Sequence, residues 1–426
     1  MLRFFKFLFI ILLVLMITLA GLLFVAIESQ PLVIANSSQQ VDEADSVKAL
    51  MSQISDSFRN RSERQTIELN AVQLNSLVGF AQRAHQHFNG VVDISAKRTA
   101  LSASYKLPAN PFGQYVNLNI NVLPAQGIEL EHVKVGGLAI PGSLALSVVT
   151  YLADWYTRSD IATQFIAQVE NITMMDGVMT VHIQPLDDFL NELNTVKQSM
   201  NPIGDEELGL RTAYYLKYLN SLDVAKKSRS QSLAKFIGPV FVKVKERSSY
   251  QTAVKENEAA IMALAIFVGH YRFANFVGEV QPVVGKIALP KAPAILAQRV
   301  DLNQHFIFSA AIKVLSDQGL SIAVGEFKEL MDRGEGGSGY SFVDLSADYA
   351  GVKFAQTATE PEKALQLQSL LAGISSETVF FPSISGLPEG FSKIEFKQRF
   401  DTIDSPEYLK LINEIHSRVD SLAIHQ

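Results

Sequence analysis

The sequence predicts an α+β protein with an N-terminal transmembrane helix, an antiparallel-sheet domain with packed helices, and then a mostly α-helical domain. An apolar run near the N-terminus predicts the membrane helix. Alternating polar and apolar residues up to about residue 195 predict the strands. Beyond residue 209, apolar residues recur every three or four positions, which predicts the helices. The predicted segments are an anchor at 1–29, a tether and amphipathic helix at 30–62, the sheet domain at 63–200 and the helical domain at 201–426.

The predicted anchor is an unbroken apolar run of 21 residues, 7–27, which would span ~30 Å of hydrocarbon. A cleaved signal peptide is the alternative, but its apolar region is usually only ~7–15 residues long and ends in small residues. Positive residues before the run place the rest of the chain outside a bacterial inner membrane, in the periplasm. The lipid bilayer is therefore an expected partner, contacted through Phe7, Leu12, Leu19 and Ile27, after the positive residues Arg3 and Lys6.

Residues 28–62 are polar and lead into an amphipathic helix that carries Val47, Leu50, Met51, Ile54 and Phe58. The segment 115–124, YVNLNINVLP, alternates apolar residues with asparagines, as in a strand with one apolar and one polar face. Asp176–Gly177 between two apolar segments indicates a hairpin. Together with a helical stretch around Trp155, these segments predict a twisted antiparallel sheet with one or two helices on its inner face.

The segment 201–209, NPIGDEELG, marks the predicted domain boundary. Residues 259–268 are apolar on nearly every side, as expected of a central buried helix. Further helices are predicted to begin at about 301, 320, 341, 360 and 405.

Composition excludes several classes of function. The formal net charge of −6 lacks the basic excess of a nucleic-acid-binding surface, so no nucleic acid is expected as a partner. The chain has no cysteine, which excludes disulfides, zinc–thiolate sites and thiol nucleophiles and suits the oxidising periplasm. The sequence contains no G-x-S-x-G elbow, H-E-x-x-H motif, P-loop or dinucleotide fingerprint.

Three segments of the helical domain each bring acids or a histidine to one helix face. The pairs are three or four residues apart, which places both members on the same side of a helix. If these sides converge, they form a carboxylate-rich pocket with a single imidazole, which could bind a hard divalent cation or hold a general base. The candidate catalytic residues are His305, Glu329, Asp344 and Asp348, and the wider polar or ligand-binding set adds Asp301, Glu326, Lys328 and Gly351.

A structural role is the favoured explanation of the same residues. Ser341 and Asp344 form an S-x-x-D capping box, and Asp301 with Gln304 can cap the preceding helix in the same way. On this interpretation Gly351 allows another helix to approach closely, and His305 hydrogen-bonds to a buried partner such as Glu329.

Residues 301–355 contain Asp-x-x-x-His-Phe, then Lys-Glu-Leu, then Gly-x-Ser-Phe-x-Asp-Leu-x-Ala-Asp-x-x-Gly. This series resembles the core motif of YfiM-like lipoproteins and is more distantly similar to VanZ-like proteins, whose helices span the membrane. The resemblance implies an envelope setting and no particular reaction. The N-terminal half is also similar to YpmS-like membrane-anchored proteins, through IELNAVQLNSLV and the later hairpin. The motif positions are Asp301, His305, Lys328, Glu329, Asp344, Asp348 and Gly351.

Three functional hypotheses follow from these observations. The first is an envelope binding or scaffold protein, with an envelope protein, lipid or glycan as ligand and with no metal or cofactor. The second is a metal-dependent envelope hydrolase that holds a divalent cation at His305, Glu329 and Asp348. The third is a lipid-binding module that uses the apolar face of the sheet domain.

Overall fold

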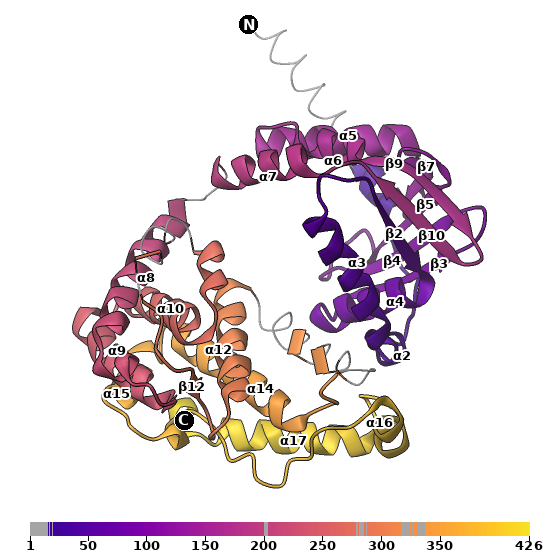
Figure 1. Cartoon of the computed structure of the whole chain (residues 1–426). Coiled ribbons are helices and arrows are strands. Elements are labelled where there is room, and N and C mark those ends of the chain that lie inside the picture. The colour runs from indigo at the N-terminus through magenta and orange to yellow at the C-terminus, as the bar shows by residue number, and fades with distance from the viewer. Residues whose placement is uncertain are drawn as a thin grey trace, which may run out of the picture. The chain divides into compact units, whose positions relative to one another are not determined.

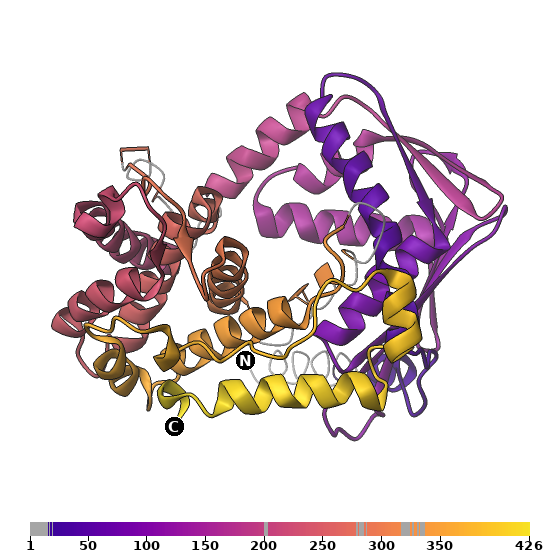
Figure 2. The ribbon, with the colours of Figure 1, turned by 60° about the horizontal axis from the view of Figure 1, so that its bottom comes forward.

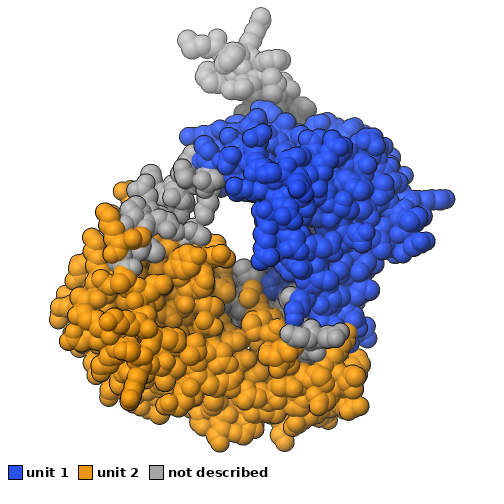
Figure 3. Space-filling model, in the orientation of Figure 1, with its two compact units in different colours: residues 1–200 blue, residues 201–426 orange. Residues whose placement is uncertain are grey.

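The computed structural model describes residues 16, 18, 20–199, 203–277, 280, 285–286, 288–316, 324–325, 328–329, 332 and 337–426. Contacts divide the chain into two compact units, residues 1–200 and 201–426, which are coloured separately in Figure 3. The first unit contains the described strands of the antiparallel sheets, and the second is mainly helical, so the mixed α and β class is confirmed.

The N-terminal segment turns from helix to strand at Ile27. Residues 20–26 are helical, but Ile27–Glu28 forms β1, in which Ile27 pairs with Val116. Ile27 was predicted to end the anchor helix, and this strand pairing corrects that assignment. The other predicted anchor positions, Phe7, Leu12 and Leu19, lie outside the described residues. Among the residues that the structure describes, no helix is long and apolar enough to cross a membrane.

The first unit contains two antiparallel sheets where the sequence predicted one. The larger sheet has the order β3-β4-β5-β7-β8, with β1 on β5, and the smaller has the order β2-β10-β9-β6. The predicted hairpin is confirmed, since Asp176 and Gly177 both have positive φ in the turn between β9 and β10. The strands are β2 Gln65–Asn70, β3 Phe88–Ile94, β4 Thr99–Lys106, β5 Tyr115–Leu123, β6 Ala125–Gln126, β7 Glu129–Val135, β8 Leu138–Pro141, β9 Val169–Met175 and β10 Val178–Ile183.

Strand β5 was predicted to have one polar and one apolar face, and the structure covers Asn117 on the polar face. Asn117 is only 4% exposed because residues 28–33 cross over it. Its side-chain oxygen accepts from the backbone N–H of Leu32 (2.9 Å) and from Ser104 Oγ (2.7 Å). The predicted tether therefore contributes buried side chains to this unit, starting with Val33.

The helices of the first unit cover the sheets, as Figure 1 shows for α3 and α4. Helix α4 begins with a full capping box, in which Asn70 and Gln73 exchange hydrogen bonds. Val47 and Leu50 of the predicted amphipathic helix are buried in α3, whereas Met51 and Phe58 are exposed. The helices are α2 Ser37–Val41, η1 Ala44–Ser46, α3 Val47–Arg59, α4 Ala71–Ala84, α5 Gly142–Thr157, α6 Ile161–Gln168 and α7 Asp187–Ser199.

The second unit surrounds the buried helix α10 and the π-helical turn η3. Residues 259–268 are at most 6% exposed, which confirms the predicted central helix. Figure 2 shows α17 running alongside α14, which it contacts. The described elements are α8 Ile203–Ser221, η2 Asp223–Lys226, β11 Gln231–Ser232, α9 Ala234–Arg247, α10 Ala253–Leu264, η3 Ala265–Gly269, η4 Tyr271–Phe276, β12 Ala294–Ile295, α12 Val300–Leu315, α14 Phe342–Thr359, α15 Ala364–Leu371, η6 Glu377–Val379, α16 Lys393–Phe400, α17 Pro406–Asp420 and η7 Ala423–His425.

The crossing of α12 and α14 depends on Gly351. A Cβ atom at this position would lie 2.0 Å from the backbone carbonyl oxygen of Phe306, so the two helices touch backbone to backbone. The packing role proposed for Gly351 thus fits the structure, and this contact fixes how the polar residues of the two helices meet.

We expect His425, near the C-terminus, to make the stability of the second unit sensitive to acid. His425 Nδ1 lies 2.7 Å from Thr357 Oγ1, and its buried Nε2 has no hydrogen-bond partner among the described residues. Burial, helped by Lys353, lowers the pKa of His425 to about 4. The unfolded chain binds this proton near pH 6.5, so the stabilisation is complete above pH 6.5 and is lost as the pH falls towards 4.

We therefore expect His425→Gln to flatten the pH dependence of stability between pH 6.5 and 4. The wild-type chain should lose about 1 kcal/mol more than the variant over this range, after allowance for partial exposure of the ring. Urea unfolding of both chains at several pH values measures the difference. If the free energy of unfolding falls with pH equally in the two chains, His425 has the same pKa in the folded and unfolded states.

Candidate ligand and cation site

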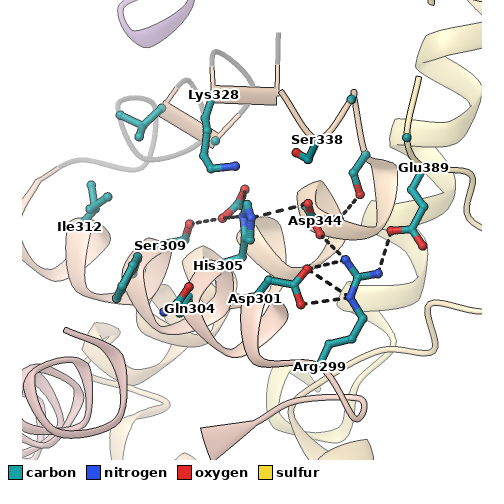
Figure 4. A pocket seen from close by; sticks show the side chains of 17 residues that line it. Arg299, Asp301, Gln304, His305, Ser309, Ile312, Lys328, Ser338, Asp344 and Glu389 are labelled. Carbon is teal, nitrogen blue, oxygen red and sulfur yellow. Dashed lines mark hydrogen bonds and ion pairs between the residues drawn. The ribbon is translucent and has the colours of Figure 1, made fainter. Parts of the chain in front are cut away.

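A pocket of about 500 Å³ opens in the second unit between α12, α14 and three connecting segments. Figure 4 shows side chains from each of these parts pointing into it. The pocket combines apolar walls with a cluster of charged groups. Its lining is Arg299, Asp301, Gln304, His305, Phe308, Ser309, Ile312, Val324, Gly325, Lys328, Ser338, Gly339, Ser341, Asp344, Asp348, Glu389 and Gly390.

Helical spacing brings the polar residues to the pocket. Asp301, His305 and Ser309 follow one another at four-residue steps on α12, and Asp344 and Asp348 do so on α14. The structure therefore unites the four candidate catalytic positions in one region, with Glu329 directly behind the lining. Glu326 lies outside the described residues, and Gly351 lies at the helix crossing and is not part of the lining.

His305 and Asp348 form the centre of the cluster. His305 Nδ1 lies 3.0 and 3.1 Å from the two carboxylate oxygens of Asp348, and Ser309 Oγ donates to the same carboxylate at 2.7 Å. Burial alone would lower the pKa of His305, but the carboxylates of Asp348 and Asp344 raise it to about 9. The hydrogen-bond partner of His305 is thus Asp348, where the sequence suggested Glu329.

The arrangement of these three side chains argues against a serine nucleophile. In a serine triad the hydroxyl donates to histidine and the carboxylate orients the other ring nitrogen. Here the hydroxyl of Ser309 donates to Asp348 itself. His305 Nε2 instead lies 3.6 Å from an oxygen of Asp344.

Glu329 is fully buried and links the cluster to the start of α14. Its Oε2 accepts from the backbone N–H of Ser341 at 3.0 Å, and Lys328 Nζ lies 3.2 Å from Oε1. Burial raises the pKa of Glu329 to about 8, although Lys328 opposes the shift. Burial therefore favours the protonated form of this carboxyl group when no cation is bound.

Helix capping explains the roles of some of these polar residues, but the starts of α12 and α14 are capped differently. Ser341 caps α14, because its Oγ accepts from the N–H of Asp344 at 3.0 Å. Glu329 takes the N–H of Ser341 that Asp344 would accept in a complete capping box, which leaves the Asp344 carboxylate for other partners. The predicted cap at Asp301 is wrong, because α12 begins at Val300 with Arg299 as its N-cap residue.

Arg299 holds one side of the pocket together, and the sequence analysis missed it. Its guanidinium contacts Asp301 at 2.5 Å, Glu389 at 2.7 Å and Asp344 at 3.2 Å, as Figure 4 shows. The hydrogen bond from Arg299 lowers the pKa of Asp301, whereas burial raises the pKa of Asp344. Ser309 was also missed, although its position four residues after His305 could have identified it.

Three groups of the cluster are close enough to hold one metal ion. His305, Glu329 and Asp348 each offer a ligand atom, and these atoms lie within 4.8 Å of one another. One imidazole nitrogen with two carboxylate oxygens suits a borderline or hard divalent ion such as Zn²⁺ or Mn²⁺. Acidic side chains outnumber basic ones around the pocket, since Asp301, Glu329, Asp332, Asp344, Asp348 and Glu389 face Arg299, Lys328 and His305. This excess of acidic groups favours a cation as the ligand.

Comparison with family models, curated proteins and solved structures finds no match to this chain.

Proposed function

We propose that this chain is a single-pass inner-membrane protein whose second unit binds a ligand in the periplasm through a divalent cation. The cation would be held by His305, Glu329 and Asp348, and the ligand would occupy the adjoining pocket. The observation that carries the proposal is the approach of these three ligand atoms to within 4.8 Å. The apolar run at 7–27 and the preceding Arg3 and Lys6 support the membrane location.

Accessibility supports a cation that can enter and leave. The side chains of His305 and Asp348 are about 10% exposed and both line the pocket, so a cation can reach them from the pocket. Glu329 is fully buried behind the lining and would contact the cation from the inner side. Ser309 and the backbone of Ser341 hold Asp348 and Glu329 in place, as outer-shell partners do around metal ligands.

The remaining pocket wall supports an organic ligand next to the cation. Phe308, Ile312 and Val324 provide an apolar side, and the Arg299 ion pairs hold the opposite side in a fixed geometry. Such a mixture of apolar wall and few polar anchors is typical of small-molecule sites. An envelope lipid or glycan with a negatively charged or polar group would meet the cation.

Metal-dependent hydrolysis is the second candidate function. It is favoured by Asp344, a pocket-lining carboxylate of raised pKa that lies beside the cluster and outside the proposed ligand set. A group of this kind can serve as a general base.

The proposal predicts one Zn²⁺ or Mn²⁺ bound per chain. The full chain, purified in detergent and stripped with chelator, should bind the ion in isothermal titration calorimetry at neutral pH. Glu329→Gln should weaken binding at least ~100-fold, because it removes a ligand charge but keeps an oxygen that can accept from the Ser341 N–H. His305→Gln should have an effect of similar size.

His425→Gln is the matched control, because it replaces another partly buried histidine of the same unit that is not part of the pocket lining. This variant should bind the ion with the wild-type affinity. If Glu329→Gln and His305→Gln bind as tightly as the wild type, or if no chain binds, the cluster is a structural network and the proposal fails.

A further inference from the structure

Helices α5 and α6 expose a broad apolar and aromatic surface. They lie side by side in the first unit, as Figure 1 shows. Tyr151, Trp155 and Tyr156 are each about 70% exposed, which is unusual for large side chains. We call this surface the α5–α6 face; it comprises Leu144, Val148, Val149, Tyr151, Leu152, Trp155, Tyr156 and Phe165.

The α5–α6 face carries almost no charge. Asp154 is the only charged residue of α5, and α6 has none. The carboxylate of Asp154 accepts from the N–H of Ala162 at 2.7 Å and from Thr163 Oγ1 at 2.6 Å, so it caps α6. Leu144, Val148 and Trp155 follow one another at helical steps, so the outward side of α5 is a continuous apolar stripe.

The chain path connects this face to the proposed anchor. The backbone oxygen of Val25, near the end of the apolar run, accepts from the N–H of Gly137 at 2.9 Å. The contact requires glycine at position 136, because a Cβ on any other residue there would lie 2.4 Å from the backbone oxygen of Ala26. Strand β8 then leads from this turn directly into α5, a distance of roughly 13 Å along the strand.

We propose that the α5–α6 face lies on the bilayer surface, as a second membrane contact of the chain. This inference rests on the proposed membrane anchoring and extends it to a named surface. Tryptophan and tyrosine favour the boundary between headgroups and acyl chains, where an amphipathic helix lies about 5–10 Å deep. A bilayer also covers an uncharged face beside the anchor without requiring a complementary protein surface.

Trp155 is the only tryptophan of the chain, so its fluorescence reports on this face alone. The full chain is reconstituted into phosphatidylethanolamine–phosphatidylglycerol vesicles, with and without brominated acyl chains. We expect brominated lipid to quench the emission at least two-fold, and iodide to quench it much less than in the urea-unfolded chain.

A matched pair of variants tests the surface. Val148 and Val72 are both helical and both 47% exposed, but only Val148 belongs to the α5–α6 face. Val148→Glu should reduce quenching by brominated lipid at least two-fold, whereas Val72→Glu should leave it unchanged. Circular dichroism verifies that both variants are folded.

The outcomes separate this inference from the anchoring itself. Protection from iodide without quenching by brominated lipid would mean that a second copy or another segment of the chain covers the face, and would overturn the inference. Quenching by iodide alone would mean an open surface and would also overturn it. In both cases flotation of the chain with the vesicles would preserve the proposed anchor, while failure to float would overturn both proposals.

Discussion

Replacing Gly351 with alanine is expected to destabilise the second unit by about 3 kcal/mol. The added Cβ would lie 2.0 Å from the carbonyl oxygen and 2.9 Å from the carbonyl carbon of Phe306. These are backbone atoms of α12, so no side-chain rotation relieves the contact and one helix must move. The roughly 1 kcal/mol by which alanine favours a helix over glycine does not offset this cost. Urea unfolding measures the change.

The same substitution should also weaken cation binding. Phe306 follows His305 directly, and Gly351 lies one turn after Asp348, so a shift of either helix separates the histidine from its carboxylate. Unchanged stability and unchanged Zn²⁺ affinity in Gly351→Ala would show that the crossing tolerates a wider helix spacing.

Local patterns in the sequence predicted local structure well. Period-two alternation identified strand β5, the Asp176–Gly177 pair identified the hairpin of β9 and β10, and continuous apolarity identified the buried helix at 259–268. What alternation could not predict is which face of a strand is covered. Asn117 is buried because residues 28–33, far away in sequence, cross over it, and its amide satisfies their backbone.

The candidate site shows the same limit. Helical spacing identified His305, Asp344 and Asp348 as residues that share helix faces, and the structure unites them. Which of these residues pair with one another depends on how α12 crosses α14. The spacing of residues within a single helix carries no information about that crossing. For that reason the partner of His305 was misassigned to Glu329, and Arg299, whose three carboxylate partners come from three segments, was missed.

A second buried ionic network lies in the same unit, and the sequence analysis did not identify it. Glu256 on α10 is 1% exposed and accepts hydrogen bonds from Arg211 and from the hydroxyl of Tyr215, both on α8. Arg247 Nε of α9 lies 3.5 Å from the same carboxylate. Burial and the hydrogen bond to Glu256 raise the pKa of Tyr215, so the phenol remains the donor. One carboxylate therefore joins three helices.

Glu256→Gln is expected to cost about 3–5 kcal/mol, because it leaves the partly buried guanidinium groups of Arg211 and Arg247 without their shared counter-charge. Glu207→Gln is the matched control: Glu207 also pairs with Arg211, at 2.7 Å, but is 45% exposed. An exposed pair of this kind should contribute far less to stability than the buried one, because solvent screens it. The double variant Arg211→Met, Glu256→Leu should recover part of the loss, because it removes one of the two guanidinium groups that lose their counter-charge. Equal losses for Glu256→Gln and Glu207→Gln in urea unfolding would mean that burial does not distinguish the two carboxylates. The network would then not be what joins α8, α9 and α10.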